Sequence, residues 1–116
     1  MTQLVVDKKA LLDRTENDPE FLRSLIGIFL TDCPGMLANI VAAVAARDPV
    51  RLMAAAHALK GTVSIFGAPA AVEAARILEF MGKEKKLEGV SIALSALERE
   101  LALVSSALEE IAKAPV

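Results

Sequence analysis

The residues whose types and spacing can support chemistry lie in one short stretch around His57, the only histidine in the chain. If this stretch is helical, successive side chains are rotated by about 100°, and His57 falls on the face opposite the apolar residues. Lys60 and Gly61 then lie one turn after His57, and Ser64 lies two turns after it on the same side. A neutral imidazole has an unprotonated ring nitrogen that can attack an electrophile. The spacing therefore predicts an exposed nucleophile beside a cation.

The neighbours of His57 indicate what kind of group it can attack. Lys60 can place its ammonium beside negatively charged oxygens on the imidazole, and Ser64 can donate a hydrogen bond to them. Gly61 costs roughly 1 kcal/mol relative to alanine inside a helix, and on a face that points away from the core it gains no packing. Its missing side chain leaves room for a phosphoryl group or for the loop of a partner protein. No arrangement typical of hydrolytic enzymes is apparent. The cation beside the imidazole favours a negatively charged group on the ring, and a phosphoryl group is one such anion.

Simpler interpretations of these residues stay open at this point. A lone histidine on a helix is more often a solvated residue without a function, and a lone lysine such as Lys60 is more often a surface residue. Metal binding is disfavoured because no second histidine, and no cysteine at ligand spacing, accompanies His57. We therefore expect no metal site.

Composition bounds the class of protein. The chain has 116 residues, of which 54% are hydrophobic and 24% charged, which favours a single folded domain over residues 1–116. The 13 basic and 15 acidic residues leave a net charge of −2, which provides no general attraction for nucleic acid or for an anionic membrane. The single cysteine, Cys33, cannot form an internal disulfide and fits a reducing cytoplasm. Because the chain start lacks a signal-like segment and no uncharged apolar run reaches roughly 18 residues, we expect a soluble cytoplasmic protein.

Start signals and apolar spacing predict five helices. Asp18-Pro19 and Asp48-Pro49 each combine a capping carboxylate with a proline at the first helical position, and Pro69 opens a further helix. In the last helix, apolar residues alternate spacings of four and three throughout. The predicted helices cover residues 8–14, 19–46, 49–66, 69–82 and 90–111, with a kink or a brief break at Pro34-Gly35.

The predicted fold follows from these elements. No window shows the alternation that is typical of strands, so the chain is predicted to be all-α. Four amphipathic helices joined by short connectors favour an up-down antiparallel four-helix bundle, with residues 8–14 as a short extra N-terminal helix. In this arrangement His57 lies midway along the second long helix and faces away from the apolar core.

The stretch around His57 resembles the signature of histidine phosphotransfer (HPt) domains of two-component phosphorelays. The resemblance extends to the first long helix and to the proline start of the histidine helix, over about residues 19–108. The matching residues are His57-x-Leu59-Lys60-Gly61-Thr62, Phe66-Gly67-Ala68, Asp18-Pro19-Glu20-Phe21-Leu22, Phe29-Leu30-x-Asp32-x-Pro34 and Asp48-Pro49.

The resemblance assigns roles to individual residues. It implies that His57 accepts a phosphoryl group, on its Nε2 nitrogen, from the phospho-aspartate of a receiver domain and passes it to another receiver. It implies that Lys60 steadies the phosphoryl oxygens and that Gly61 clears the approach. The family often places a polar residue on the next helix to orient the imidazole, and Glu79 matches that position, with Lys83 one turn further. From the residues alone, Glu79 and Lys83 are equally well explained as a solvated pair.

The resemblance also implies partners. These are the receiver domains of response regulators, and a hybrid sensor histidine kinase is a further candidate. The receiver would supply the aspartate and its bound Mg²⁺, so this chain is expected to need no cofactor and no nucleotide site of its own, and it has no G-x-x-x-x-G-K loop. The expected docking surface consists of small and apolar residues around His57, which are Met53, Ala54 and Ala58. Two alternatives stay open: the phospho-accepting domain of a larger hybrid or chemotaxis-type histidine kinase, and an adaptor bundle that binds a receiver without carrying phosphate.

Overall fold

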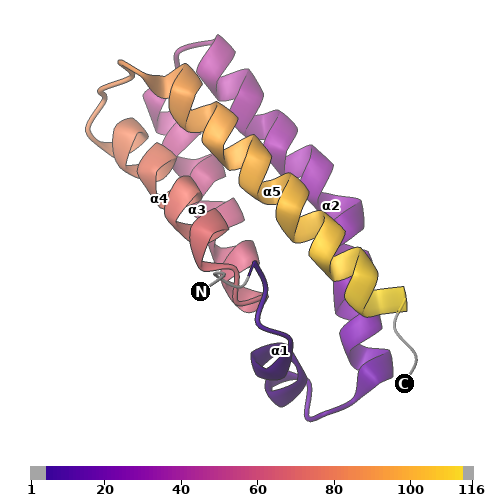
Figure 1. Ribbon diagram of the computed structural model, residues 1–116. Helices are drawn as coiled ribbons and strands as arrows, with labels where there is room; N and C mark the ends of the chain where they lie inside the picture. Colours follow the sequence, from indigo (N-terminus) through magenta and orange to yellow (C-terminus); the bar gives the residue numbers. More distant parts are fainter. Residues whose placement is uncertain (1–4, 114–116) are drawn as a thin grey trace.

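Five helices make up most of the computed structural model, which describes residues 5–113 (Figure 1). They are α1 (Lys8–Arg14), α2 (Pro19–Ala45), α3 (Pro49–Ile65), α4 (Pro69–Lys83) and α5 (Val90–Lys113). No strand occurs between residues 5 and 113, so the predicted all-α class is confirmed over this range. The observed helix ends differ from the predicted ones by at most two residues. Residues 1–4, at the start of the sequence, lie outside the described residues, as do residues 114–116.

The helix starts are built as the sequence predicts. The carboxylates of Asp7, Asp18 and Asp48 accept hydrogen bonds from backbone amides in the first turns of α1, α2 and α3. Prolines open α2, α3 and α4, where an amide donor would have no partner within the helix. These signals are local, because a cap is formed by residues within a few positions of each other.

The helix α2 continues through Pro34, so a break at this position is wrong. Pro34 offers no N–H to the carbonyl of Leu30, but it lies on the exposed side of α2, where water can take the place of the missing donor. Phe29 and Ile40 are buried on either side of it. Packing of both halves against the core therefore outweighs the local cost of the proline.

The core lies between the four longer helices. The helix α3 packs on both α2 and α4, and α5 packs on the same two helices (Figure 1). The connection from α3 to α4 is short because Gly67 adopts a φ of +60°, a backbone conformation that glycine reaches without strain. The largest side chains with less than 2% exposure include Ile26, Phe29, Ile40, Leu52, Leu59, Leu78, Leu97 and Leu108.

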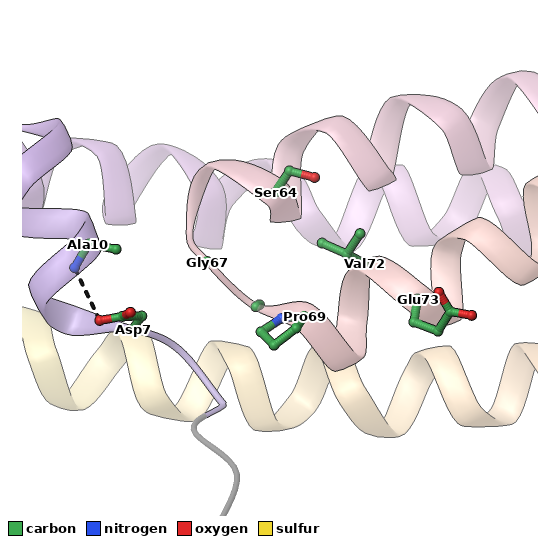
Figure 2. Close-up of a pocket in the computed structure, with 8 residues that line it drawn as sticks. Asp7, Ala10, Ser64, Gly67, Pro69, Val72 and Glu73 are labelled. Atoms are coloured by element: carbon green, nitrogen blue, oxygen red, sulfur yellow. Dashed lines mark hydrogen bonds between the residues drawn. The ribbon is translucent and has the colours of Figure 1, made fainter.

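The short helix α1 is tied to the end of the histidine-bearing helix. The Arg14 guanidinium donates hydrogen bonds to the backbone carbonyls of Ser64 and Ile65, at 3.3 and 3.2 Å. These carbonyls belong to the last turn of α3, where a positive charge is favoured by the helix dipole. A shallow pocket lies beside this contact, and Figure 2 shows it bounded by α1, the end of α3 and the start of α4.

Among the described helices, α2 alone is long and apolar enough to qualify as a membrane span by length and composition. This criterion is weak, since the core helix of a soluble protein meets it equally well. Six residues of α2 are buried within the bundle: Leu22, Ile26, Phe29, Cys33, Ile40 and Ala43.

The contact between Phe29 and Phe66 joins α2 to the end of α3. Because Phe66→Ala would leave a cavity in the core at this contact, we predict that it lowers the free energy of unfolding by about 3–5 kcal/mol. The two rings lie 5.0 Å apart between centroids, and Phe66 is 3% exposed. Urea denaturation followed by circular dichroism measures the loss. The neighbouring Ile65 is 45% exposed, so Ile65→Ala is the matched control and should cost less than about 1 kcal/mol. Equal losses in the two variants would contradict this assignment of the core.

Candidate functional site

His57 stands on the outer surface of α3, as the sequence predicts. Its side chain is 69% exposed, whereas Leu59 and Val63 on the opposite face of the helix are fully buried. The exposed ring makes one specific contact: its Nδ1 lies 2.6 Å from Oε2 of Glu79 on α4. Glu79, which the family resemblance matched to a residue that orients the imidazole, therefore contacts His57 although the two are 22 positions apart in the sequence.

Glu79 joins His57 to Lys60. Its other oxygen, Oε1, accepts a hydrogen bond from the Lys60 ammonium at 2.5 Å. The side chain of Glu79 is only 19% exposed, and that of Lys60 is 29% exposed, so this ion pair is partly shielded from water. The bond from Lys60 holds the pKa of Glu79 below its ordinary value; partial burial acts in the opposite direction, and the bond from His57 adds to the lowering. Glu79 is therefore ionised at neutral pH.

The bond to Glu79 fixes which nitrogen of His57 carries the proton. An ionised carboxylate can only accept a hydrogen bond, so the hydrogen in the contact must belong to Nδ1. In a neutral ring the other nitrogen, Nε2, then has a free lone pair. Because Glu79 occupies the Nδ1 edge of a largely exposed ring, Nε2 is the nitrogen that is available to react.

The other site residues predicted from the sequence are placed in different ways. A Cβ added to Gly61 would meet nothing within 4 Å, so the space beside Gly61, one turn after His57, is open. Ser64 does not contact His57, because its hydroxyl donates to the Lys60 carbonyl at 2.8 Å and its side chain lies at the pocket beside α1 (Figure 2). Lys83 lies exposed in the last turn of α4 and forms no ion pair with Glu79, whose carboxylate is already held by His57 and Lys60.

The predicted docking residues lie on the same outer side of α3. Ala54 and Ala58 are exposed, and Met53 is half-buried against α4. Two larger apolar residues extend this surface and were not predicted as part of it: Val50 is 60% exposed and Ile65 is 45% exposed. Their helical angles place them on the same side of α3 as Ala54, and this signal could have identified them from the sequence.

Within residues 5–113, no three histidine, cysteine or acidic side chains are grouped so that they could hold a metal ion. Cys33 is buried in α2, and this burial raises the pKa of its thiol. A buried thiol of this kind is a packing residue and a poor nucleophile. His57, whose side chain is 69% exposed, is therefore a better candidate nucleophile than Cys33.

Comparison with known proteins agrees with this geometry. A family model described as "Hpt domain" matches residues 24–111, a range that contains the histidine, the lysine and the glutamate of the site. The chain belongs to the Hpt domain family. It is similar to the crystal structure of histidine-containing phosphotransfer protein B (HptB) from Pseudomonas aeruginosa PAO1, with 25% sequence identity and a TM-score of 0.86. The match covers 94% of this chain and 95% of the other. A comparison with curated proteins returned no match.

Membership of the Hpt family defines the function in general terms. The chain is a histidine phosphotransfer domain that acts as an intermediate in a phosphorelay. Hpt domains carry phosphoryl groups and are not kinases, and they interact with the receiver domains of response regulators or hybrid kinases. The resemblance inferred from the sequence around His57 is therefore confirmed.

The lowered pKa of Glu79 makes a prediction about the pH dependence of stability. The unfolded chain binds the Glu79 proton more readily than the folded protein does, so this contribution to stability is fully present above the ordinary pKa of 4.5. It disappears as the pH falls through the lowered pKa of the folded state. We therefore expect wild type to be more stable than Glu79→Gln at pH 7, and the difference to shrink below pH 4.5. Urea titrations at pH 7 and at steps down to about pH 3 test this, and a difference that grows on acidification would contradict it.

Proposed function

We propose that His57 accepts a phosphoryl group on Nε2 from the phospho-aspartate of a receiver domain and passes it to the aspartate of another receiver. The observation that carries this proposal is the exposed imidazole whose Nδ1 is held by an ionised carboxylate. That contact keeps the lone pair on Nε2 and leaves one edge of the ring open to a partner. The role of the individual residues is inferred from this geometry and from their match to the Hpt signature.

The transfer step balances around the two ring nitrogens. The Nε2 lone pair forms a bond to phosphorus while the bond from phosphorus to the aspartyl oxygen breaks, and the bonding electrons leave with the restored carboxylate of the receiver. The phosphorylated ring then carries a positive charge, because Nδ1 keeps its proton. Glu79 offsets that charge through the existing bond. Transfer to the next receiver reverses these changes.

Lys60 supplies the positive charge for the incoming phosphoryl oxygens. Its ammonium is held 2.5 Å from Glu79, one helical turn from His57, and it is 29% exposed. A group with three donors can keep its bond to Glu79 and still contact a phosphoryl oxygen on His57. Lys60 thereby links the carboxylate that holds the ring to the group that the ring carries.

The other groups that the transfer requires are assigned to the partner protein. We infer that the receiver supplies the Mg²⁺ and the donors that stabilise the phosphoryl group in flight, and that this chain has no cofactor and no ATP site of its own. The supporting observation is that the sequence lacks a G-x-x-x-x-G-K loop. The outer surface of α3, with Met53, Ala54 and Ala58, is proposed as the docking surface. A cytoplasmic location without contact with membrane or nucleic acid accords with the net charge of −2.

We also propose that α2 to α5 form an up-down antiparallel bundle, as expected from their pairwise packing and short connections. The single-domain interpretation accords with the buried core that these helices share. A longer histidine kinase that contains this domain would use the same site residues in the same way.

Phosphoryl transfer to His57 is tested by incubating the protein with a receiver labelled on its aspartate. We expect label that is labile to acid and stable to alkali on wild type, and no label on His57→Gln. His57 is exposed and its replacement leaves the core intact, so both proteins should fold equally well. If neither receives label from its cognate receivers while both still bind them, the protein is an adaptor. Persistent label on His57→Gln would show that another residue is the acceptor.

The open space beside Gly61 makes a second functional prediction. Gly61→Gln should retain the fold and gain up to about 1 kcal/mol of stability, because glutamine favours a helix more than glycine does. Its side chain should nevertheless slow phosphoryl transfer, because it fills the approach to His57. Stopped-flow transfer rates and urea denaturation measure the two effects. Equal transfer rates for this variant and wild type would refute the role of Gly61.

A further inference from the structure

The helices α3 and α4 approach each other closely at Gly82, one turn after Glu79 along α4. A Cβ placed on Gly82 would lie 2.6 Å from the Pro49 carbonyl oxygen and 2.7 Å from the Met53 backbone nitrogen. Both distances are shorter than real side chains show, and both neighbours are backbone atoms that cannot rotate away. Any side chain at Gly82 must therefore move one helix relative to the other.

The close approach at Gly82 lies next to the contact between Glu79 and His57. Gly82 meets Met53 one turn before His57, and Glu79 meets His57 itself. The two contacts are therefore successive steps along the same pair of helices, which run in opposite directions. The distance between the helices at Gly82 sets how far Glu79 must reach to the imidazole.

Other glycines within helices show that this close approach is particular to Gly82. A Cβ added to Gly27, Gly35 or Gly61 would meet nothing within 4 Å. Gly82 is buried, whereas these three are exposed. A glycine costs helix stability wherever it occurs inside a helix, so at Gly82 the cost is offset by the close packing that its missing side chain permits.

We propose that Gly82 is a positioning residue for phosphotransfer, which keeps α4 close enough to α3 for Glu79 to bond both His57 and Lys60. The proposal rests on the proposed role of His57. It predicts that a side chain at Gly82 loosens the bridge without touching the nucleophile. The ring would then lose its fixed tautomer, and Nε2 would carry the proton for part of the time.

The first test is the tautomer of His57, measured by the nitrogen chemical shifts of the ring in labelled protein at neutral pH. We expect wild type to hold the proton on Nδ1 and Gly82→Ala to shift toward the form with the proton on Nε2. The control is Gly27→Ala on α2, which should leave the tautomer unchanged because its new Cβ meets open space. An unchanged tautomer in Gly82→Ala, or an equal shift in the control, would overturn the proposal. This readout does not depend on phosphorylation, so it is separate from a failure of the proposed function.

The second test asks whether Gly82 acts through Glu79. Gly82→Ala should slow transfer from a phosphorylated receiver by about 10-fold to 100-fold, since a misplacement of about 1 Å can cost on the order of 100-fold. In the Glu79→Ala background the same substitution should cause no further loss, because the bridge is already absent. Losses that multiply in the double variant would show that Gly82 acts on transfer by another route, and would overturn the proposal.

If Gly82→Ala does not fold, a third variant, Glu79→Asp, tests the proposal. Glu79→Asp draws the carboxylate back by about 1.5 Å, one carbon–carbon bond, without altering the helix contact. It should shift the tautomer of His57 in the same direction as Gly82→Ala. A ring identical to wild type would mean that the bridge tolerates a larger displacement than Gly82 prevents, and would overturn the proposal.

Discussion

The carboxylate of Glu79, shared between His57 and Lys60, is the interaction on which the properties of the site depend. A carboxylate that is mostly removed from water needs donors, and both donors come from α3, one turn apart. The ammonium of Lys60 lowers the pKa of Glu79 and so favours its ionised form, and the ionised Glu79 in turn holds the proton of His57 on Nδ1. The tautomer of an exposed imidazole is thus set by a contact on one edge of the ring, between α3 and α4.

The two faces of α3 separate stability from reactivity. Leu52, Leu59 and Val63 are fully buried on one face and hold the helix in the bundle. The other face carries His57 and the exposed small residues Ala54, Ala58 and Gly61, which contribute little to the core. A partner can therefore approach His57 without disturbing the packing. The hydrogen bonds from His57 and Lys60 to Glu79 connect the exposed face of α3 to the packed helix α4.

Much of the fold could be predicted from the sequence because its signals are local. Asp18-Pro19 and Asp48-Pro49 determine where two helices begin, and the regular apolar spacing identifies α5 over nearly its full length. Of the kink or brief break predicted at Pro34, the break was wrong, because the cost of one proline was weighed without the packing on both sides of it. The orientation of His57 toward solvent could likewise be predicted from its angular position around the helix, opposite the apolar residues.

The parts of the site that depend on contacts between helices were harder to predict. The family resemblance indicated Glu79, but the residues alone could not separate a bridge to His57 from a pair with Lys83. Ser64 was predicted to donate a hydrogen bond to a phosphoryl group on the imidazole; in the structure its hydroxyl donates to a backbone carbonyl of its own helix, as serine hydroxyls within helices often do. Gly82 carried no signal at all, because its importance arises from backbone atoms some 30 positions earlier in the chain, which only the packed structure brings next to it.

The most direct test of the mechanism is to identify the ring nitrogen that carries the phosphoryl group. Protein labelled with ¹⁵N and phosphorylated by a phospho-receiver should show coupling between ³¹P and Nε2 of His57, with the Nδ1 proton still bonded to Glu79. Coupling to Nδ1 would contradict the mechanism, because that nitrogen is occupied by the carboxylate in the structure.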